Sequence, residues 1–219
     1  MPINNFEIIR NFLHFELDGD IYFAEVIARG KDEGKSGKRL IRDFHIHSLE
    51  HFDKLKPEII DLCDHYGARC YLRLNQRNMD ELNSYLKIKL EEQEILRKQS
   101  LRKFIRTGCD KNRIEKLPKV VSASKLFASV MGTYSSEPRE SRKWTIDVDM
   151  DDSGRTLDEI AATYEDAVLK CNGKIYARIP SRTGMHLVIS PINKESYAQI
   201  MGSASTIITD GITNLYIGD

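Results

Sequence analysis

The strongest constraint on the fold is the order of strands and helices in the last third of the chain. Between two of the expected strands, Thr156 and Glu159 form a capping box that opens an amphipathic helix, and a weaker helix covers 194–201. The expected strands are 143–149, 174–179, 185–189 and 206–210. The resulting order, β-α-β-β-α-β, predicts a mainly antiparallel, RRM-like sheet with both helices on one face.

The first hundred residues predict a separate β-β-α-β-α module. Two β-rich segments, 20–28 and 39–47, flank a turn-rich basic stretch and form a hairpin. A helix that ends at Gly67 follows, then a strand at 68–75 and another amphipathic helix. We therefore expect an α+β protein of two α/β modules: an N-terminal module at 1–100, a basic helical connector at 101–142 and the RRM-like catalytic module at 143–219.

Charge is balanced over the whole chain but not along it. Lys and Arg total 33 of the 219 residues, as do Asp and Glu, so net charge says nothing about partners. Residues 97–119 hold nine basic side chains against two acidic ones, whereas 140–170 hold nine acidic against four basic. A basic stretch can hold nucleic-acid phosphates without sequence preference, although it can also be only a solvated helix face. The candidate nucleic-acid contacts are Arg97, Lys98, Arg102, Lys103 and Arg106.

The sequence predicts a cytoplasmic protein with no membrane partner. Its first residues lack the basic and then apolar pattern of a signal peptide, and no apolar run reaches the roughly 18 residues that a membrane span needs. The four cysteines form no CxxC pair, so we expect reduced thiols rather than a disulfide framework or a zinc site.

Asp147 and Asp149 are the first candidates for chemistry. They lie two residues apart on an expected strand, so both carboxylates share one face while Val148 points into the core. A cation offsets two adjacent anions, and such a pair suits metal-assisted phosphoryl or nucleotidyl transfer with Mg²⁺ or Mn²⁺. A polar turn before the next helix is the structural alternative. A calcium loop is a weaker one, because Asp152 stands where an EF-hand needs Gly.

His186 follows a turn that begins at Ser181 and feeds an expected strand. Backbone N–H groups in such a turn can approach an anion, and an imidazole just beyond it can bond a phosphate oxygen. Arg178 and Arg182 are further candidate contacts to a nucleotide. Asp210 ends the last expected strand and reaches the aspartate pair if the two strands are neighbours. Each of these residues alone also fits a structural role.

Taken in order, these residues resemble the three motifs of the archaeo-eukaryotic primase (primase-polymerase) superfamily. The family has an Asp-x-Asp pair on a strand, a turn that ends in His and a final Asp after apolar residues. The matching segments here are 147–149, 181–186 and 207–214. Gly184 stands two residues before His186, where the family pattern has Ser. The resemblance implies that the metal ligands and catalytic residues are Asp147, Asp149 and Asp210, and that the nucleotide contacts are His186, Ser181, Arg182 and Arg178.

The resulting hypothesis is template-directed nucleotidyl transfer by a DNA primase or primase-polymerase. It requires Mg²⁺ or Mn²⁺, nucleoside triphosphates and a single-stranded nucleic-acid template, with a replication helicase as a candidate partner. Two alternatives stay open: a non-catalytic domain of the same fold that binds single-stranded nucleic acid, and a metal-dependent nuclease that uses the same carboxylates.

Two other patterns are weaker. The segment from Lys31 to Gly34 mimics the lysine motif of covalent nucleotidyltransferases such as RNA ligases, but a solvated hairpin turn explains it better. His45 and His47 share a strand face and could bind metal, although simple alternation on a half-exposed strand explains them more readily.

Overall fold

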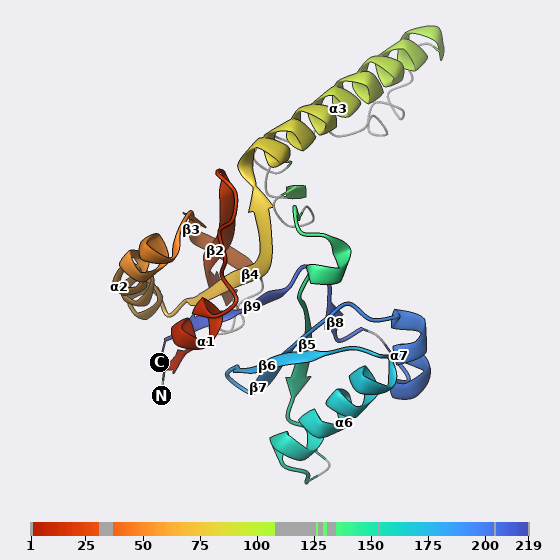
Figure 1. Cartoon of the computed structure of the whole chain (residues 1–219). Coiled ribbons are helices and arrows are strands. Elements are labelled where there is room, and N and C mark those ends of the chain that lie inside the picture. The colour runs from red at the N-terminus through yellow and green to blue at the C-terminus, as the bar shows by residue number, and fades with distance from the viewer. Residues whose placement is uncertain are drawn as a thin grey trace. The chain divides into compact units, whose positions relative to one another are not determined.

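Two compact units make up the chain in the computed structural model (Figure 1). The first combines Met1–Arg77 with Ser135–Asp219, and the second, Asn78–Tyr134, is inserted between these segments. Both β-sheets and all the expected metal and nucleotide ligands belong to the first unit. The structure describes residues 2–30, 37–107, 126, 129–130, 135–152, 154–203 and 205–218, without the side chains of 100 and 103–107.

Helices and strands alternate along the chain as expected for an α+β protein. In the N-terminal half they are β1 (Ile3–Asn4), α1 (Phe6–Arg10), β2 (Asp20–Arg29), β3 (Lys38–Ile46), α2 (Leu49–Tyr66), β4 (Arg69–Asn78) and α3 (Met79–Thr107). In the C-terminal half they are the 3-10 helix η2 (Arg139–Ser141), β5 (Trp144–Asp149), α6 (Leu157–Lys170), β6 (Ile175–Pro180), β7 (Gly184–Ile189), α7 (Lys194–Met201), β8 (Ile207–Ile208) and β9 (Ile212–Ile217).

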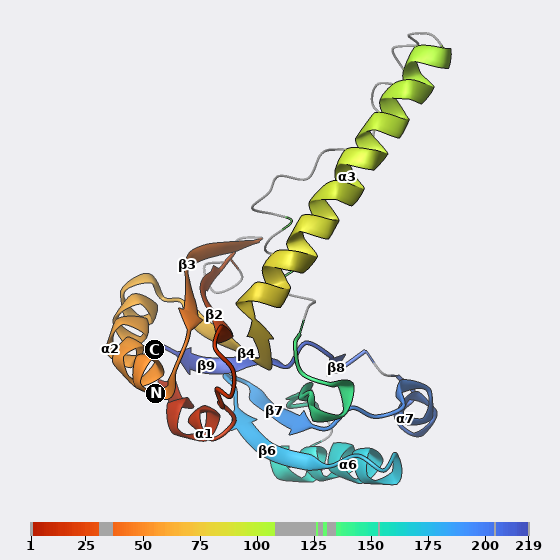
Figure 2. The ribbon, with the colours of Figure 1, turned by 45° about the horizontal axis from the view of Figure 1, so that its top comes forward.

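Five strands form sheet A in the order β1-β9-β4-β2-β3. The predicted hairpin is present, because β2 and β3 pair antiparallel from Tyr22 to Arg29. Helix α2 packs on this sheet (Figure 2). It starts where the Ser48 hydroxyl accepts the His51 N–H, and it ends where Gly67 takes a left-handed conformation with φ 55°.

Four strands form sheet B in the order β6-β7-β5-β8, with antiparallel pairing. Its elements follow the predicted order, β5-α6-β6-β7-α7-β8. The predicted capping box starts α6, because the Thr156 hydroxyl accepts the Glu159 N–H while the Glu159 carboxylate accepts the Thr156 N–H. Ile160 and Val168 of α6 and Tyr197 of α7 pack with the apolar side chains of β5 and β7. Both helices therefore lie on one face of sheet B.

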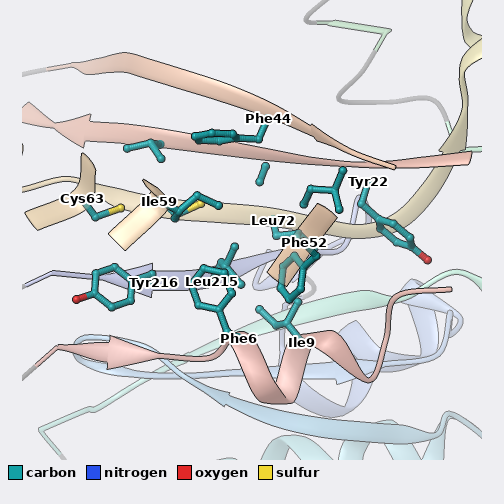
Figure 3. Close-up of a cluster of buried hydrophobic side chains, with 14 of the residues drawn as sticks. Phe6, Ile9, Tyr22, Phe44, Phe52, Ile59, Cys63, Leu72, Leu215 and Tyr216 are labelled. Atoms are coloured by element: carbon teal, nitrogen blue, oxygen red, sulfur yellow. The ribbon is translucent and has the colours of Figure 1, made fainter. Parts of the chain in front are cut away.

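One hydrophobic core ties the two sheets together. Phe6 of α1 and Phe52 of α2 pack with apolar side chains of β2, β4 and β9 (Figure 3). Ile179 of β6 and Val188 of β7 belong to the same buried cluster. Because each large apolar side chain gains about 1.5–3 kcal/mol on burial, this shared core is a major reason that both sheets form a single unit.

Strand β9 differs from the expectation drawn from the sequence. It pairs antiparallel with β1 and β4 in sheet A, with Thr213 opposite Leu72. The expected boundaries at 1–100, 101–142 and 143–219 would instead assign it to the C-terminal module, so they differ from the two observed units. Which strands pair depends on packing between residues distant in sequence. Local signals such as alternation and turn residues do not predict it.

The two points where the inserted unit joins the first unit, after Arg77 and before Ser135, are close together. The Gln76 carbonyl accepts hydrogen bonds from the Ser136 N–H at 3.1 Å and from the Ser135 hydroxyl at 3.0 Å. The Gln76 N–H in turn donates to Glu137 Oε1 at 2.8 Å, and Glu137 pairs with Lys143 Nζ at 2.9 Å. The two ends of the insertion are thus joined by contacts made within the first unit.

Replacing 78–134 with a short Gly-Ser loop should leave the first unit folded. The ends already lie within hydrogen-bonding distance, so a short loop closes them at little entropic cost. We expect one cooperative urea transition and dispersed amide NMR signals for the shortened protein. A chain without a cooperative transition would show that the first unit needs the second one to fold.

Candidate active site

Strand β5 sorts its side chains to opposite faces of sheet B. Trp144, Ile146 and Val148 are buried in the core beneath α6 and α7. Asp147 and Asp149 alternate with them and therefore share the opposite face, as the spacing predicts. Asp147 is partly exposed and Asp149 is exposed, so both carboxylates can meet a ligand from solvent.

His186 lies directly across from Asp147 in the pairing of β5 with β7. Its Nε2 atom is 3.4 Å from Asp147 Oδ1. The hydrogen bond from His186 lowers the pKa of the Asp147 carboxyl, and the charges of His186 and Arg29 add to this effect against the opposing influence of burial. The structure therefore brings together two of the predicted site residues and keeps Asp147 ionised.

Residues from β9 hold the other side of the imidazole ring. His186 Nδ1 lies 2.9 Å from Thr213 Oγ1, and Nε2 lies 3.5 Å from Asn214 Nδ2. All three side chains are buried. The sequence assigns no role to Thr213 and Asn214, which end the segment that resembles the third primase motif, because they meet His186 only through the placement of β9 in sheet A.

The turn before His186 packs tightly on the end of β5. Ser181 N–H donates to the Gly184 carbonyl at 3.0 Å, and the Thr183 hydroxyl donates to Asp149 Oδ1 at 3.0 Å. A Cβ atom at Gly184 would overlap the Val148 carbonyl oxygen and lie 2.9 Å from the Asp149 Cα. This close approach of two backbones gives a physical reason for glycine at the position where the primase pattern has Ser.

Gly184→Ala should separate β5 from β7 and destabilise the protein by about 3 kcal/mol, because the added methyl group meets backbone atoms that cannot rotate away. Gly154→Ala is the comparison, since a Cβ there meets no atom within 4 Å and only its φ of 76° is unfavourable. We expect a loss of about 1 kcal/mol for that variant. Urea unfolding measures both, and equal losses would contradict the proposed strand clash.

Asp210 lies toward the opposite end of β5. Strands β8 and β5 pair antiparallel at Ile208 and Thr145, so Asp210, two residues further on, lies toward the start of β5. At about 3.3 Å per residue, this position is about 13 Å along the strand from Asp147. Within the described ranges, no group of three or more His, Cys, Asp or Glu side chains is arranged to hold a metal ion. A three-carboxylate site therefore stays a prediction of the sequence resemblance.

The Asp210 carboxylate is engaged by an arginine of sheet A. Arg73 Nη1 forms an ion pair with Asp210, and Arg73 Nη2 lies 3.3 Å from Glu25 Oε2. The Arg73 side chain is only 14% exposed. Nearby on β4, Arg77 is fully buried, and burial foremost lowers the pKa of its guanidinium to about 10. These side chains form a mostly buried network of arginines and carboxylates around Asp210.

Arg73→Gln should cost about 1–3 kcal/mol of unfolding free energy, because it leaves two largely buried carboxylates without their cation. Arg178→Gln is the matched control, since Arg178 also bridges two carboxylates, those of Asp158 and Glu165, but is 39% exposed. We expect a loss below about 1 kcal/mol there. Urea denaturation of both variants tests the difference, and an equal loss would refute it.

Of the two arginines predicted to contact a nucleotide, the fold places Arg182 near the aspartate pair and Arg178 on the opposite face of sheet B. Arg178 Nη1 lies 2.7 Å from Asp158 and its Nε lies 2.7 Å from Glu165, both on α6. It therefore faces α6, away from His186 on the other side of the sheet. Arg182 and Ser181 lie in the turn that packs against Asp149, so only these two stay beside the aspartate pair.

The predicted nucleic-acid contacts lie on α3 in the second unit. Arg97 and Lys98 are about two-thirds exposed and lie 3.7 Å and 3.4 Å from Glu94, and Arg102 is exposed. Exposed pairs of this kind contribute little stability, so the cations stay available to phosphate. Lys103 and Arg106 belong to the helix, but their side chains lie outside the described residues. Over the parts of the chain that are described, no helix combines the length and apolar character needed to cross a membrane.

The weaker metal candidates make pairwise contacts. His45 Nε2 lies 3.7 Å from Asp43 Oδ2, and the rings of His47 and His51 stack with centroids 5.5 Å apart. Asp151 follows Asp147 and Asp149 at the same two-residue spacing, as the calcium-loop alternative requires, and it pairs with Arg155 at 2.7 Å. Lys31, which carries the ligase alternative, lies outside the described residues.

Comparison with family models, curated proteins and solved structures finds no match to this chain. The chemistry of the site must therefore carry any functional assignment. Asp147 and Asp149 are oxygen ligands of the type that Mg²⁺ and Mn²⁺ prefer. Neither carboxylate forms an ion pair with Lys or Arg in the described part of the chain. The aspartate pair fits a divalent cation, whereas Asp210 is already neutralised by Arg73.

Proposed function

We propose that this protein catalyses template-directed nucleotidyl transfer, as a DNA primase or primase-polymerase. The observation that carries the proposal is the pairing of β5 with β7, which sets two ionisable carboxylates beside a histidine. Asp147 and Asp149 share one face of β5, and His186 lies opposite Asp147 with Nε2 3.4 Å from its carboxylate. This combination of anions and a polarised N–H suits a metal-bound triphosphate.

Each side chain has a distinct role in the proposed reaction. Asp147 and Asp149 hold Mg²⁺ or Mn²⁺, which supplies charge neutralisation and activation of the attacking hydroxyl group. His186 directs its Nε2–H toward the triphosphate. The turn at Ser181 and Arg182 offers backbone and guanidinium N–H groups to the same phosphates.

Asp210 has a secondary place in this proposal. Its carboxylate can serve as a third metal ligand only if Arg73 releases it. Arg178 has no role, because it is engaged by two carboxylates of α6. The proposed partners are a single-stranded template, held in part by the basic residues of α3, nucleoside triphosphates and a replication helicase, with the cytoplasm as the compartment.

The test combines the protein, a single-stranded template, labelled nucleoside triphosphates and Mn²⁺ or Mg²⁺. Metal-dependent products that lengthen with time are expected from the wild type. The double variant Asp147→Asn, Asp149→Asn should reduce synthesis at least about 100-fold, because amides bind divalent cations far more weakly than carboxylates. Asp158→Asn is the matched control, since it removes an exposed carboxylate on the opposite face of sheet B.

The thermal unfolding midpoint of the double variant should stay close to that of the wild type, because both substitutions keep side-chain shape at partly or fully exposed positions. Equal synthesis by the wild type and the double variant would contradict the proposal. Shortening of the template would indicate the nuclease instead. Absence of products, with equal template binding by both proteins, would indicate a non-catalytic binding domain.

A further inference from the structure

Each nitrogen atom of the His186 ring contacts a residue of a different sheet. Nε2 faces Asp147 on β5 of sheet B, at 3.4 Å from Oδ1. Nδ1 faces Thr213 on β9 of sheet A, at 2.9 Å from Oγ1. Asn214 flanks the same ring, with its amide group 3.5 Å from Nε2. Its Oδ1 has no hydrogen-bond partner among the described residues, and turning the amide by 180° presents this acceptor to Nε2–H. The Thr213 side chain is fully buried, so solvent does not replace its hydroxyl.

The partners of the ring determine which nitrogen carries the proton. An ionised carboxylate only accepts hydrogen bonds, so Asp147 favours a proton on Nε2, but this contact is long at 3.4 Å and the Asp147 side chain is 45% exposed. In a neutral imidazole with a proton on Nε2, Nδ1 is an acceptor. The Thr213 hydroxyl is then the donor to Nδ1, and this hydrogen bond stabilises the Nε2–H form over the Nδ1–H form.

We propose that Thr213 is a positioning residue for His186, whose hydroxyl fixes both the orientation of the ring and the tautomer with the proton on Nε2. The proton then points toward the aspartate pair, where the triphosphate binds in the proposed reaction. The inference rests on that proposed function for its consequence in catalysis, but the tautomer itself can be observed in the protein alone.

The substitution that tests this role is Thr213→Val, which keeps the shape of the side chain and removes the hydroxyl. Thr213→Ser restores the hydroxyl and should restore the wild-type behaviour. Thr145→Val is the matched control: Thr145 is also fully buried and its hydroxyl also links the two sheets, by donating to the Ile212 carbonyl at 3.0 Å. No hydrogen bond joins its hydroxyl to His186 in the described structure. If Thr213→Val does not fold, Thr213→Ala removes the same hydroxyl without adding a methyl group in its place.

The first measurement is the ¹⁵N NMR spectrum of the His186 imidazole at a pH where the ring is neutral, in protein without metal or nucleotide. Wild type, Thr213→Ser and Thr145→Val should show the Nε2–H tautomer. Thr213→Val should show an increased fraction of the Nδ1–H tautomer, because the long contact with Asp147 then favours the proton on Nε2 only weakly. An unchanged tautomer in Thr213→Val, or the same change in Thr145→Val, overturns the proposal.

The second measurement separates KM from kcat in the synthesis assay. A misdirected Nε2–H weakens binding of the triphosphate, so Thr213→Val should raise the nucleotide KM about threefold to tenfold, the loss expected for one hydrogen bond. The kcat should change less than about twofold. A fall in kcat alone, or equal effects in Thr145→Val, contradicts the positioning role. If the wild type makes no product, nucleotidyl transfer fails as the function, while the NMR result still decides the role of Thr213.

Discussion

The organisation of the first unit depends on a strand that serves both sheets. β9 is hydrogen-bonded within sheet A, between β1 and β4. Its side chains and carbonyl groups nevertheless reach sheet B, where the Ile212 carbonyl accepts the Thr145 hydroxyl and Thr213 contacts His186. Because these bonds are buried, they cannot be exchanged for water without cost, so they fix one sheet relative to the other at the site.

The carboxylates around this strand fall into two electrostatic classes. Asp210 and Glu25 share the cation of Arg73, and Glu137 has Lys143, so these acids contribute to stability and are neutralised within the fold. Among the described side chains, Asp147 and Asp149 contact an imidazole and a hydroxyl group, and the charge of Arg29 also acts on Asp147, but neither forms an ion pair with Lys or Arg. Their negative charge is therefore left for a cation from solution. Asp210 and the aspartate pair thus differ in their electrostatic role, although all three belong to the segments that carry the sequence resemblance.

Local patterns predicted the parts of the structure that depend on local interactions. The capping box at Thr156, the hairpin and the shared face of Asp147 and Asp149 all follow from spacing along one segment. The partner of Asp210 and the sheet that β9 joins depend on residues more than a hundred positions away, which no periodicity encodes. Gly184 is intermediate: the sequence shows the glycine, but only the strand pairing shows what it must avoid.

The position of β9 also has a consequence for the order in which the chain can fold. Ile3 pairs with Ile217, so β1 cannot form its pairing until β9 has been synthesised. While a ribosome is still making the second unit, β1 and β4 lack the strand that separates them in sheet A. Sheets completed by such distant partners form slowly and leave strand edges exposed meanwhile. The support for His186 thus arises only after β9 has been synthesised, so a nascent chain would carry the aspartate pair before it carries an ordered site.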